Sequence, residues 1–172
     1  MTEQKGVSYL LDAIKQYRDR HGDVDFTFAG KGDMERMIRE FVDSNKLANV
    51  RIRRVASAPA VLNELDVFVH PSVGDAMPVS IAEALMCGLP CIVCNVGGCA
   101  DLVRDGIEGF VIEPRRSELI LNRMERFADM AAEEFKGFRQ RARARYEEVC
   151  MPASVGSIVA EHYRAVMGGS SI

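Results

Sequence analysis

Apolar residues along the chain follow two different spacings. Segments 7–17 and 34–42 carry them at intervals of three and four residues, which predicts an amphipathic helix in each. Shorter apolar runs, bounded by glycine, proline or charged residues, have the length of buried strands. Five such runs therefore predict strands: DFTFAG, NVRI, LDVFVH, PCIVC and GFVIEP.

Helices are expected between these strands. Ser57 stands where it could cap a helix over residues 58–64, with Pro59 in the first turn. Gly88 would close a helix over residues 79–87. The segment GGCADLVRDG carries a further short helix.

The remaining chain predicts a helical C-terminal part. Residues 117–167 are expected to form two or three helices with a break near Pro152, and residues 168–172 (GGSSI) to fray. Strands that alternate with helices predict parallel βαβ units. The predicted fold class is therefore α/β, with a Rossmann-like, doubly wound parallel sheet in one domain over residues 1–167.

Composition narrows the classes of function. The 172 residues are 48% hydrophobic and 27% charged, which is ordinary for a globular domain. The net charge of −3 argues against binding to nucleic acid as the main function. No apolar run approaches the ~18 residues of a membrane span, and MTEQKGVSYL lacks a signal-peptide pattern. We therefore expect a cytoplasmic protein without a membrane span.

Four of the five cysteines are close together in the sequence, and two of them, Cys91 and Cys94, form a C-x-x-C pair. This spacing can indicate zinc or redox chemistry. The pair falls within the predicted strand PCIVC, where residues three apart point to opposite faces. We therefore expect buried structural cysteines and no metal site.

Candidate chemistry lies in residues 70–90, HPSVGDAMPVSIAEALMCGLP. The strand ends near His70, and the following loop leads into a helix whose free N–H groups favour an anion such as diphosphate. Glu83, about one turn into that helix, can accept hydrogen bonds from ribose hydroxyls, and Asp75 can reach a second sugar. The alternative reading is an ordinary pairing of acids with the helix dipole. His70 itself favours a structural or supporting role over proton transfer.

The order of several segments resembles the C-terminal, donor-binding domain of retaining GT-B glycosyltransferases of family 4. That family carries Pro-Ser-x-x-Glu-Gly, a second Glu eight residues after the first, Ala-x-x-x-Gly-x-Pro, Gly-Gly-x-x-Glu, and Asp-Gly-x-x-Gly before a strand ending in Pro. The segments here that match are PSVGDAMP, EALMCGLP, GGCAD and DGIEGFVIEP, together with KGVSYLLDAI, which begins with the lysine-glycine pair near the start of the chain. The resemblance covers nearly the whole chain.

The resemblance implies roles for individual residues. Lys5 matches a lysine that neutralises the departing diphosphate, and Asp75 matches the acid that contacts the transferred sugar; these two are the expected catalytic residues. Glu83 matches the acid that holds the ribose. The full set of expected donor-binding residues is Glu83, Ala76, Met77, Val79, Ser72, Gly30, Gly32 and Arg54.

The resemblance also implies a reaction. A sugar passes from a nucleotide-diphosphate sugar to a glycan, lipid or small-molecule acceptor with retention of anomeric configuration. No metal or other cofactor takes part, so catalysis rests on positioning and electrostatic stabilisation. The expected setting is polysaccharide biosynthesis, with peripheral membrane association of the full-length protein as a further expectation.

Four positions depart from the family pattern. Asp75 is one methylene shorter than Glu, so its oxygens reach ~1.5 Å less far. Ala76 replaces a glycine where backbone and ligand come close. Arg54 stands where the family usually has glycine, and Asp101 replaces the Glu of Gly-Gly-x-x-Glu.

In the family, a central strand with an arginine precedes the lysine that matches Lys5. Only MTEQ precedes Lys5 here, so we expect this chain to lack that strand, its arginine and the N-terminal acceptor domain. The strands DFTFAG and LDVFVH would then have unpaired edges or close the gap between them. We therefore expect the chain alone to be inactive.

Other functions stay open at this point. The chain could be a non-catalytic nucleotide-sugar-binding module or truncated pseudo-enzyme, or a GT-B nucleotide-sugar epimerase. A dinucleotide dehydrogenase is disfavoured, because GKGDME follows a strand but lacks G-x-G-x-x-G.

Overall fold

The computed structural model describes residues 3–21, 24–54 and 57–168. Five short strands and nine helical segments alternate over these ranges, as the sequence predicts. In chain order they are η1 (Glu3–Lys5), α1 (Val7–His21), β1 (Phe26–Ala29), α2 (Glu35–Ser44), β2 (Val50–Arg53), α3 (Ala58–Leu62), β3 (Phe68–His70), α4 (Val79–Met86), β4 (Cys91–Cys94), α5 (Cys99–Leu102), β5 (Gly109–Ile112), α6 (Ser117–Ala128), α7 (Ala132–Val149) and α8 (Pro152–Gly168).

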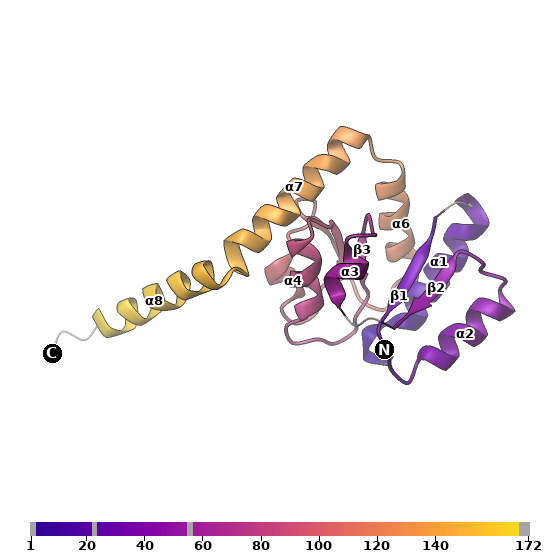
Figure 1. Cartoon of the computed structure of the whole chain (residues 1–172), viewed down its shortest axis with the longest axis horizontal. Coiled ribbons are helices and arrows are strands. Elements are labelled where there is room, and N and C mark those ends of the chain that lie inside the picture. The colour runs from indigo at the N-terminus through magenta and orange to yellow at the C-terminus, as the bar shows by residue number, and fades with distance from the viewer. Residues whose placement is uncertain (1–2, 22–23, 55–56, 169–172) are drawn as a thin grey trace.

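Helices cover both faces of the parallel strands, which confirms the α/β, doubly wound fold class (Figure 1). One core cluster joins α1 and α6 to one face, and a second joins α3, α4, α5 and α7 to the other. Cys94 and Ile92 belong to the first cluster, whereas Cys91 and Val93 belong to the second. The strand β4 therefore contributes alternate side chains to two cores.

Cys91, Cys94 and Cys99 are buried free thiols, whereas Cys87 and Cys150 are half-buried. Cys91 and Cys94 pack on opposite faces of β4, as their spacing predicts. Burial raises the pKa of Cys94 to about 12 and that of Cys91 further, so both thiols stay protonated near neutral pH. Among the described residues, no group of three or more His, Cys, Asp or Glu side chains is placed to hold a metal ion.

The strands form two separate sheets. One has the order β1-β2 and the other β3-β4-β5. The strands β1 and β3, which belong to different sheets, are not paired with each other. With one strand between them, the order would match the 3-2-1-4-5-6 sheet of Rossmann folds.

A cavity of about 490 Å³ occupies the gap between β1 and β3. The N–H groups of Phe26 and Gly30 donate to carbonyls on the β2 side, those of Asn49 and Arg53. Because successive residues of a strand bond in opposite directions, Thr27 and Ala29 direct their backbone groups towards the cavity. Phe68 bonds likewise to the β4 side, which leaves Val67 and Val69 facing the cavity. Both facing edges therefore present backbone donors and acceptors, together with apolar side chains.

Two local predictions need correction. Ser57 occupies the N-cap position of α3 with an extended backbone, but its side chain makes no capping hydrogen bond. The helix there is also shorter than the predicted 58–64 and ends at Leu62. At the C-terminus, α8 continues to Gly168, and the rest of the predicted frayed tail lies outside the described residues.

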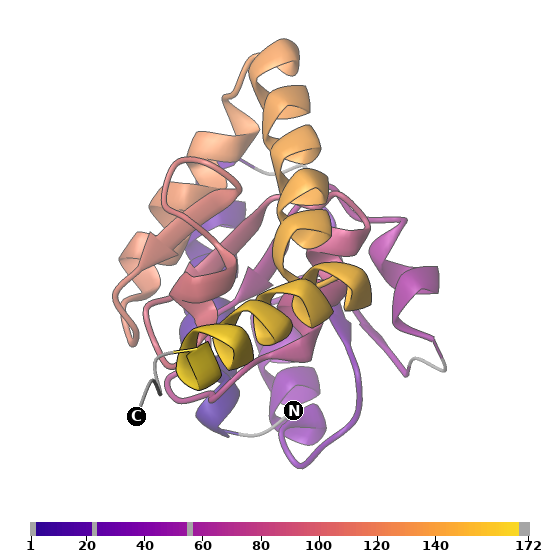
Figure 2. The same ribbon diagram turned by 90° about the vertical axis from the view of Figure 1, so that its left-hand side faces the viewer.

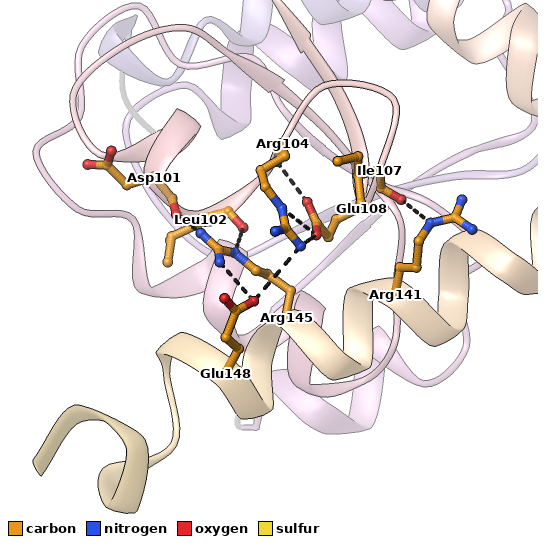
Figure 3. A network of polar contacts seen from close by, with 8 residues as sticks. All are labelled: Asp101, Leu102, Arg104, Ile107, Glu108, Arg141, Arg145 and Glu148. Atoms are coloured by element: carbon orange, nitrogen blue, oxygen red, sulfur yellow. Dashed lines mark hydrogen bonds and ion pairs between the residues drawn. The ribbon is translucent and has the colours of Figure 1, made fainter. Parts of the chain in front are cut away.

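Arginines of α7 hold this helix against α5 and against the connection from α5 to β5 (Figure 3). Arg145 donates to the carbonyls of Asp101 and Leu102, at 2.6 and 3.3 Å, and Arg141 donates to the carbonyl of Ile107 at 2.7 Å. Arg141 and Arg145 thus dock α7 against α5 and the segment that follows it.

Glu108 is fully buried and is the centre of the same network. Its carboxylate accepts hydrogen bonds from the backbone N–H of Arg104, at 2.8 Å, and from Nε of that side chain, at 2.9 Å. A buried charge of this kind is stable only with its partners in place.

The last helix, α8, extends away from the rest of the chain and faces the viewer in Figure 2. Its main contacts are with α7. Val155, Val159 and Tyr163 recur at intervals of four and are exposed. Within the part of the chain that the structure describes, no helix has both the length and the apolar character to cross a membrane.

We expect Arg104→Met to lower the free energy of unfolding clearly, because it leaves the fully buried Glu108 carboxylate without a charged donor. Arg36→Met is the matched control, since Arg36 makes an exposed i,i+4 pair with Glu40 and its loss should change the stability little. Urea unfolding of the three proteins measures both effects. Equal losses for the two variants would contradict a stabilising role for the pair in the buried network.

Candidate functional site

The loops that follow β1, β2, β3 and β4 meet at the carboxyl edge of the two sheets. Gly30 follows β1, Arg54 follows β2, and residues 71–78 follow β3. Parallel strands place the ends of all these strands at one edge, where α/β proteins bind ligands. Lys5 comes to the same edge from η1, so segments far apart in the sequence converge there.

Backbone contacts fasten η1 to the loop after β3. The carbonyl of Gln4 accepts hydrogen bonds from the N–H of Val73, at 2.8 Å, and from the hydroxyl of Ser72, at 2.9 Å. Gly6 has φ +63°, and a Cβ there would lie 1.9 Å from the carbonyl oxygen of Pro71. A side chain at position 6 would therefore push η1 and Lys5 away from the loop.

A second glycine lets the loop after β4 approach from the other side. Gly97 has φ +50°, and a Cβ there would lie 1.7 Å from the backbone carbonyl oxygen of Asp75. Next to it, the N–H of Gly98 donates to the carbonyl of Ala76 at 2.8 Å. The Gly-Gly pair thus packs directly against the loop that carries Asp75.

Three titratable side chains meet at the centre of this edge. The Lys5 ammonium forms an ion pair with Oδ2 of Asp75, and the same oxygen lies 3.1 Å from Nε2 of His70. Burial acts to raise the pKa of the Asp75 carboxyl, but the hydrogen bonds from Lys5 and His70 together lower it. Burial lowers the pKa of His70 more strongly than its bond to Asp75 raises it. Near neutral pH the carboxylate is therefore ionised and the imidazole neutral.

The N-terminus of α4 opens beside this group. Pro78 precedes the helix with no side-chain cap, and among the described residues the N–H groups of Val79 and Ser80 have no backbone acceptor. Ser80 and Glu83 line the end of the cavity together with Lys5 and His70. The edge thus combines a cation, a free helix N-terminus and a half-buried carboxylate.

The other predicted donor-binding residues differ in exposure. Met77 and Val79 are exposed, at 59% and 69%, and Ala76 is exposed beside them. Gly30 lines the cavity. Ser72, in contrast, is fully buried, and its hydroxyl donates to the carbonyls of Gln4 and Gly74. Its role in this structure is to join η1 to the loop, and its contact with a donor stays a prediction.

Two further predicted residues lie farther along the edge. Arg54 is exposed and pairs with Glu35 of α2 at 3.4 Å. Gly32 lies in the loop after β1, with φ +154°. The structure brings Lys5, Glu83 and Gly30 to the cavity, but Gly32 and Arg54 are not among the residues that line it. Asp75 does not line the cavity either and lies beside it through its ion pair with Lys5.

Sequence reasoning did not identify two contributors. Gln4 acts through its backbone carbonyl, and no side-chain pattern signals such a contact. The steric need for Gly97 depends on a loop more than twenty residues away in the chain. The sequence shows the Gly97-Gly98 pair, but it does not show that this pair packs against the loop that carries Asp75.

Comparison with known proteins assigns the chain to a family. Residues 1–130 match the family Glycosyl transferases group 1. The chain belongs to this family. Its fold is the Rossmann-like C-terminal half of a GT-B glycosyltransferase, as the sequence motifs predict.

Individual glycosyltransferases show the extent of the similarity. The chain is 33% identical over 131 residues to an *Escherichia coli* protein named UDP-Gal:alpha-D-GlcNAc-diphosphoundecaprenol alpha-1,3-galactosyltransferase, covering 73% of this chain and 34% of that protein. It is 25% identical over 157 residues to the putative colanic acid biosynthesis glycosyltransferase WcaL of *Escherichia coli* K12, covering 86% and 39%. The chain thus spans about a third of the length of these curated relatives.

Solved structures share the fold. A crystal structure of *Anabaena* Alr3699/HepE in complex with UDP-glucose has a TM-score of 0.82 at 20% identity, over 96% of this chain and 46% of that one. A glycosyltransferase from *Rickettsia africae* has a TM-score of 0.83 at 20% identity, over 99% and 46%. At this identity, the likeness establishes the fold of the glycosyltransferase chain and nothing finer.

We expect Gly97→Ala to destabilise this glycosyltransferase chain by at least about 1 kcal/mol, because alanine is strained at φ +50° and meets the Asp75 carbonyl. Gly74→Ala is the control in the neighbouring loop after β3, since a Cβ there meets nothing within 4 Å. Denaturant unfolding measures both variants. A Gly97→Ala protein as stable as Gly74→Ala would contradict the close approach of the two loops.

Proposed function

We propose that the chain is the donor-binding half of a retaining glycosyltransferase that uses a nucleotide-diphosphate sugar. The proposal rests on the convergence of Lys5, Asp75, Glu83 and the open N-terminus of α4 at one edge of the sheet. A diphosphate suits Lys5 and the helix N-terminus, because both offer positive potential and hydrogen-bond donors. The two carboxylates then lie where hydroxyl groups on either side of the diphosphate would be bound.

Each residue has a distinct role in this proposal. Lys5 stabilises the negative charge that grows on the diphosphate as it leaves, Asp75 binds the transferred sugar, and Glu83 binds the ribose. The backbone N–H groups of Val79 and Ser80 are free to bind phosphate oxygens. Transfer without a metal ion is part of the proposal, with Lys5 and the helix N-terminus supplying the positive potential.

A uridine nucleotide is the first donor class to test. The *Escherichia coli* relative is named for UDP-Gal, and the *Anabaena* structure contains UDP-glucose. The acceptor is proposed to be a glycan or a lipid-linked sugar, held by an N-terminal domain outside residues 1–172. A cytoplasmic location, with peripheral membrane association of the complete enzyme, completes the proposal.

A second function, a non-catalytic nucleotide-sugar-binding module, is favoured by one specific observation. The cavity between β1 and β3 leaves two strand edges unpaired beside the site. A site with an open wall admits water, in which charge stabilisation is weaker. Binding and catalysis therefore need separate tests.

Glu83→Ala tests the ribose contact. We expect it to weaken binding of UDP by several-fold while leaving the binding of inorganic diphosphate nearly unchanged, because only UDP carries the ribose. Isothermal titration of both ligands measures the difference. Glu133→Ala, at an exposed position in the first turn of α7, controls for the loss of one negative charge. An equal loss for UDP and diphosphate would contradict the ribose assignment.

We expect the 172-residue chain alone not to transfer sugar. The reaction needs an acceptor held in place, and the lost proximity effect can be worth ~7–11 kcal/mol. The test compares this chain with a form extended upstream of Lys5 by a β-strand and an acceptor domain, using assays of donor hydrolysis and transfer.

Transfer by the extended form alone supports the half-enzyme proposal. Comparable transfer by both forms would overturn the claim that this chain is half of the catalytic unit. Donor binding without transfer in either form would favour the binding module.

A further inference from the structure

Asp75 is held from two sides by groups that differ in charge and in access to solvent. Its Oδ2 pairs with the Lys5 ammonium and lies 3.1 Å from Nε2 of His70. The Lys5 side chain is 45% exposed, whereas those of Asp75 and His70 are 16% and 7% exposed. A ligand arriving from solvent therefore has access to the lysine, while the imidazole and carboxylate are largely covered.

The contact between His70 and Asp75 fixes the position of a proton. An ionised carboxylate can only accept hydrogen bonds, so Nε2 of His70 carries the hydrogen in this contact and Nδ1 of the neutral ring does not. The ring also stacks on Phe68, with centroids 6.2 Å apart. Asp75 thus has one charged donor, Lys5, and one uncharged donor that stays in place without a charge of its own.

The Lys5–Asp75 pair is not needed to hold the loop. The Gln4 carbonyl already accepts hydrogen bonds from Val73 and Ser72, and Gly98 bonds to the carbonyl of Ala76. These contacts fasten the loop through its backbone on both sides. The ion pair is therefore free to exchange when a ligand binds.

Positively charged side chains are few in the cavity that Lys5 lines. Of the described residues that line the cavity, Lys5 is the only lysine or arginine, whereas Asp25 and Glu83 add negative charge. An anion that binds at the end of the cavity lined by Lys5 must therefore take this lysine at least partly from Asp75.

We propose that Asp75 competes with the donor's diphosphate for Lys5, and that His70 is the positioning residue that holds Asp75 after this exchange. The inference rests on the proposed function. Without a bound donor, the Asp75 carboxylate forms an ion pair with the Lys5 ammonium. When phosphate takes the lysine, the hydrogen bond from His70 keeps the carboxylate in place, and its freed lone pairs accept a hydroxyl of the sugar.

This exchange predicts opposite effects on two classes of ligand. For a diphosphate without a sugar, the competition with Asp75 for Lys5 weakens binding, and no new contact compensates for this loss. A nucleotide sugar recovers part of that loss, because the displaced carboxylate gains a sugar hydroxyl. The preference for a nucleotide sugar over the same nucleotide therefore depends on both Asp75 and His70.

The experiment measures the affinities of the chain for inorganic diphosphate, UDP and UDP-galactose by isothermal titration. We expect Asp75→Asn to bind inorganic diphosphate about two- to five-fold more tightly than the parent, the range expected for releasing a partly exposed ion pair. Asp12→Asn, which removes the same charge from an exposed position on α1, controls for net charge and should change little.

Two replacements of His70 test its positioning role. Phenylalanine keeps an aromatic ring beside Phe68 but has no N–H, so His70→Phe should lower the ratio of UDP-galactose to UDP affinity. Glutamine places an amide N–H near the position of Nε2, so His70→Gln should restore much of that ratio. Unfolding curves of each variant separate these effects from a loss of folded protein.

The outcomes distinguish this inference from the proposed function. If the parent binds UDP but Asp75→Asn gains no affinity for diphosphate, the competition is wrong and the proposed function stands. If His70→Phe and His70→Gln shift the affinity ratio equally, the hydrogen bond is not what positions Asp75. If the folded parent and variants bind none of the three ligands, both the inference and the proposed function fail.

Discussion

The direction of the strands is the constraint on which the rest of this structure depends. All pairings within the two sheets are parallel, so the loops after β1, β2, β3 and β4 leave from one edge. That edge receives Lys5 from η1 and Asp75 from the loop after β3, although the two are 70 residues apart. The helix α4 begins at the same edge because it follows β3 directly. Strand direction therefore brings Lys5 to an acid and a helix N-terminus that lie 70 residues or more away in the chain, without any local sequence signal for their meeting.

The break between β1 and β3 ties stability to the candidate site. The unpaired edges have backbone groups that a further strand could satisfy, and the same cavity ends at Lys5, His70 and Glu83. Across this gap the two sheets are joined mainly by the packing of α1 against α6 and by the contacts of η1 with the loop after β3. Any segment that completes the sheet would therefore also form a wall of the site, because both use the same open space.

The sequence predicts the parts of this structure that depend on local periodicity. The five strands follow from short apolar runs, and the opposite faces of Cys91 and Cys94 follow from the alternation of side chains along a strand. The position of the gap follows from the resemblance to the family. Features that depend on contacts between distant segments were not predictable. Ser57 has the residue type of a cap but makes no capping bond, and Arg145 belongs to a charged run whose pattern does not reveal carbonyl partners near α5.

The candidate site shows the same limit in its electrostatics. The resemblance to the family assigns Lys5 to a phosphate and Asp75 to a sugar, each considered separately. Their pairing in the folded chain means that neither acts alone, because every anion that binds the lysine changes the environment of the carboxylate. His70 links that pair to the buried end of β3, where its own charge is disfavoured. The affinity of this edge for a diphosphate therefore depends on Lys5, Asp75 and His70 together. It depends on how strongly Asp75, held by His70, competes with the diphosphate for the exposed Lys5 ammonium.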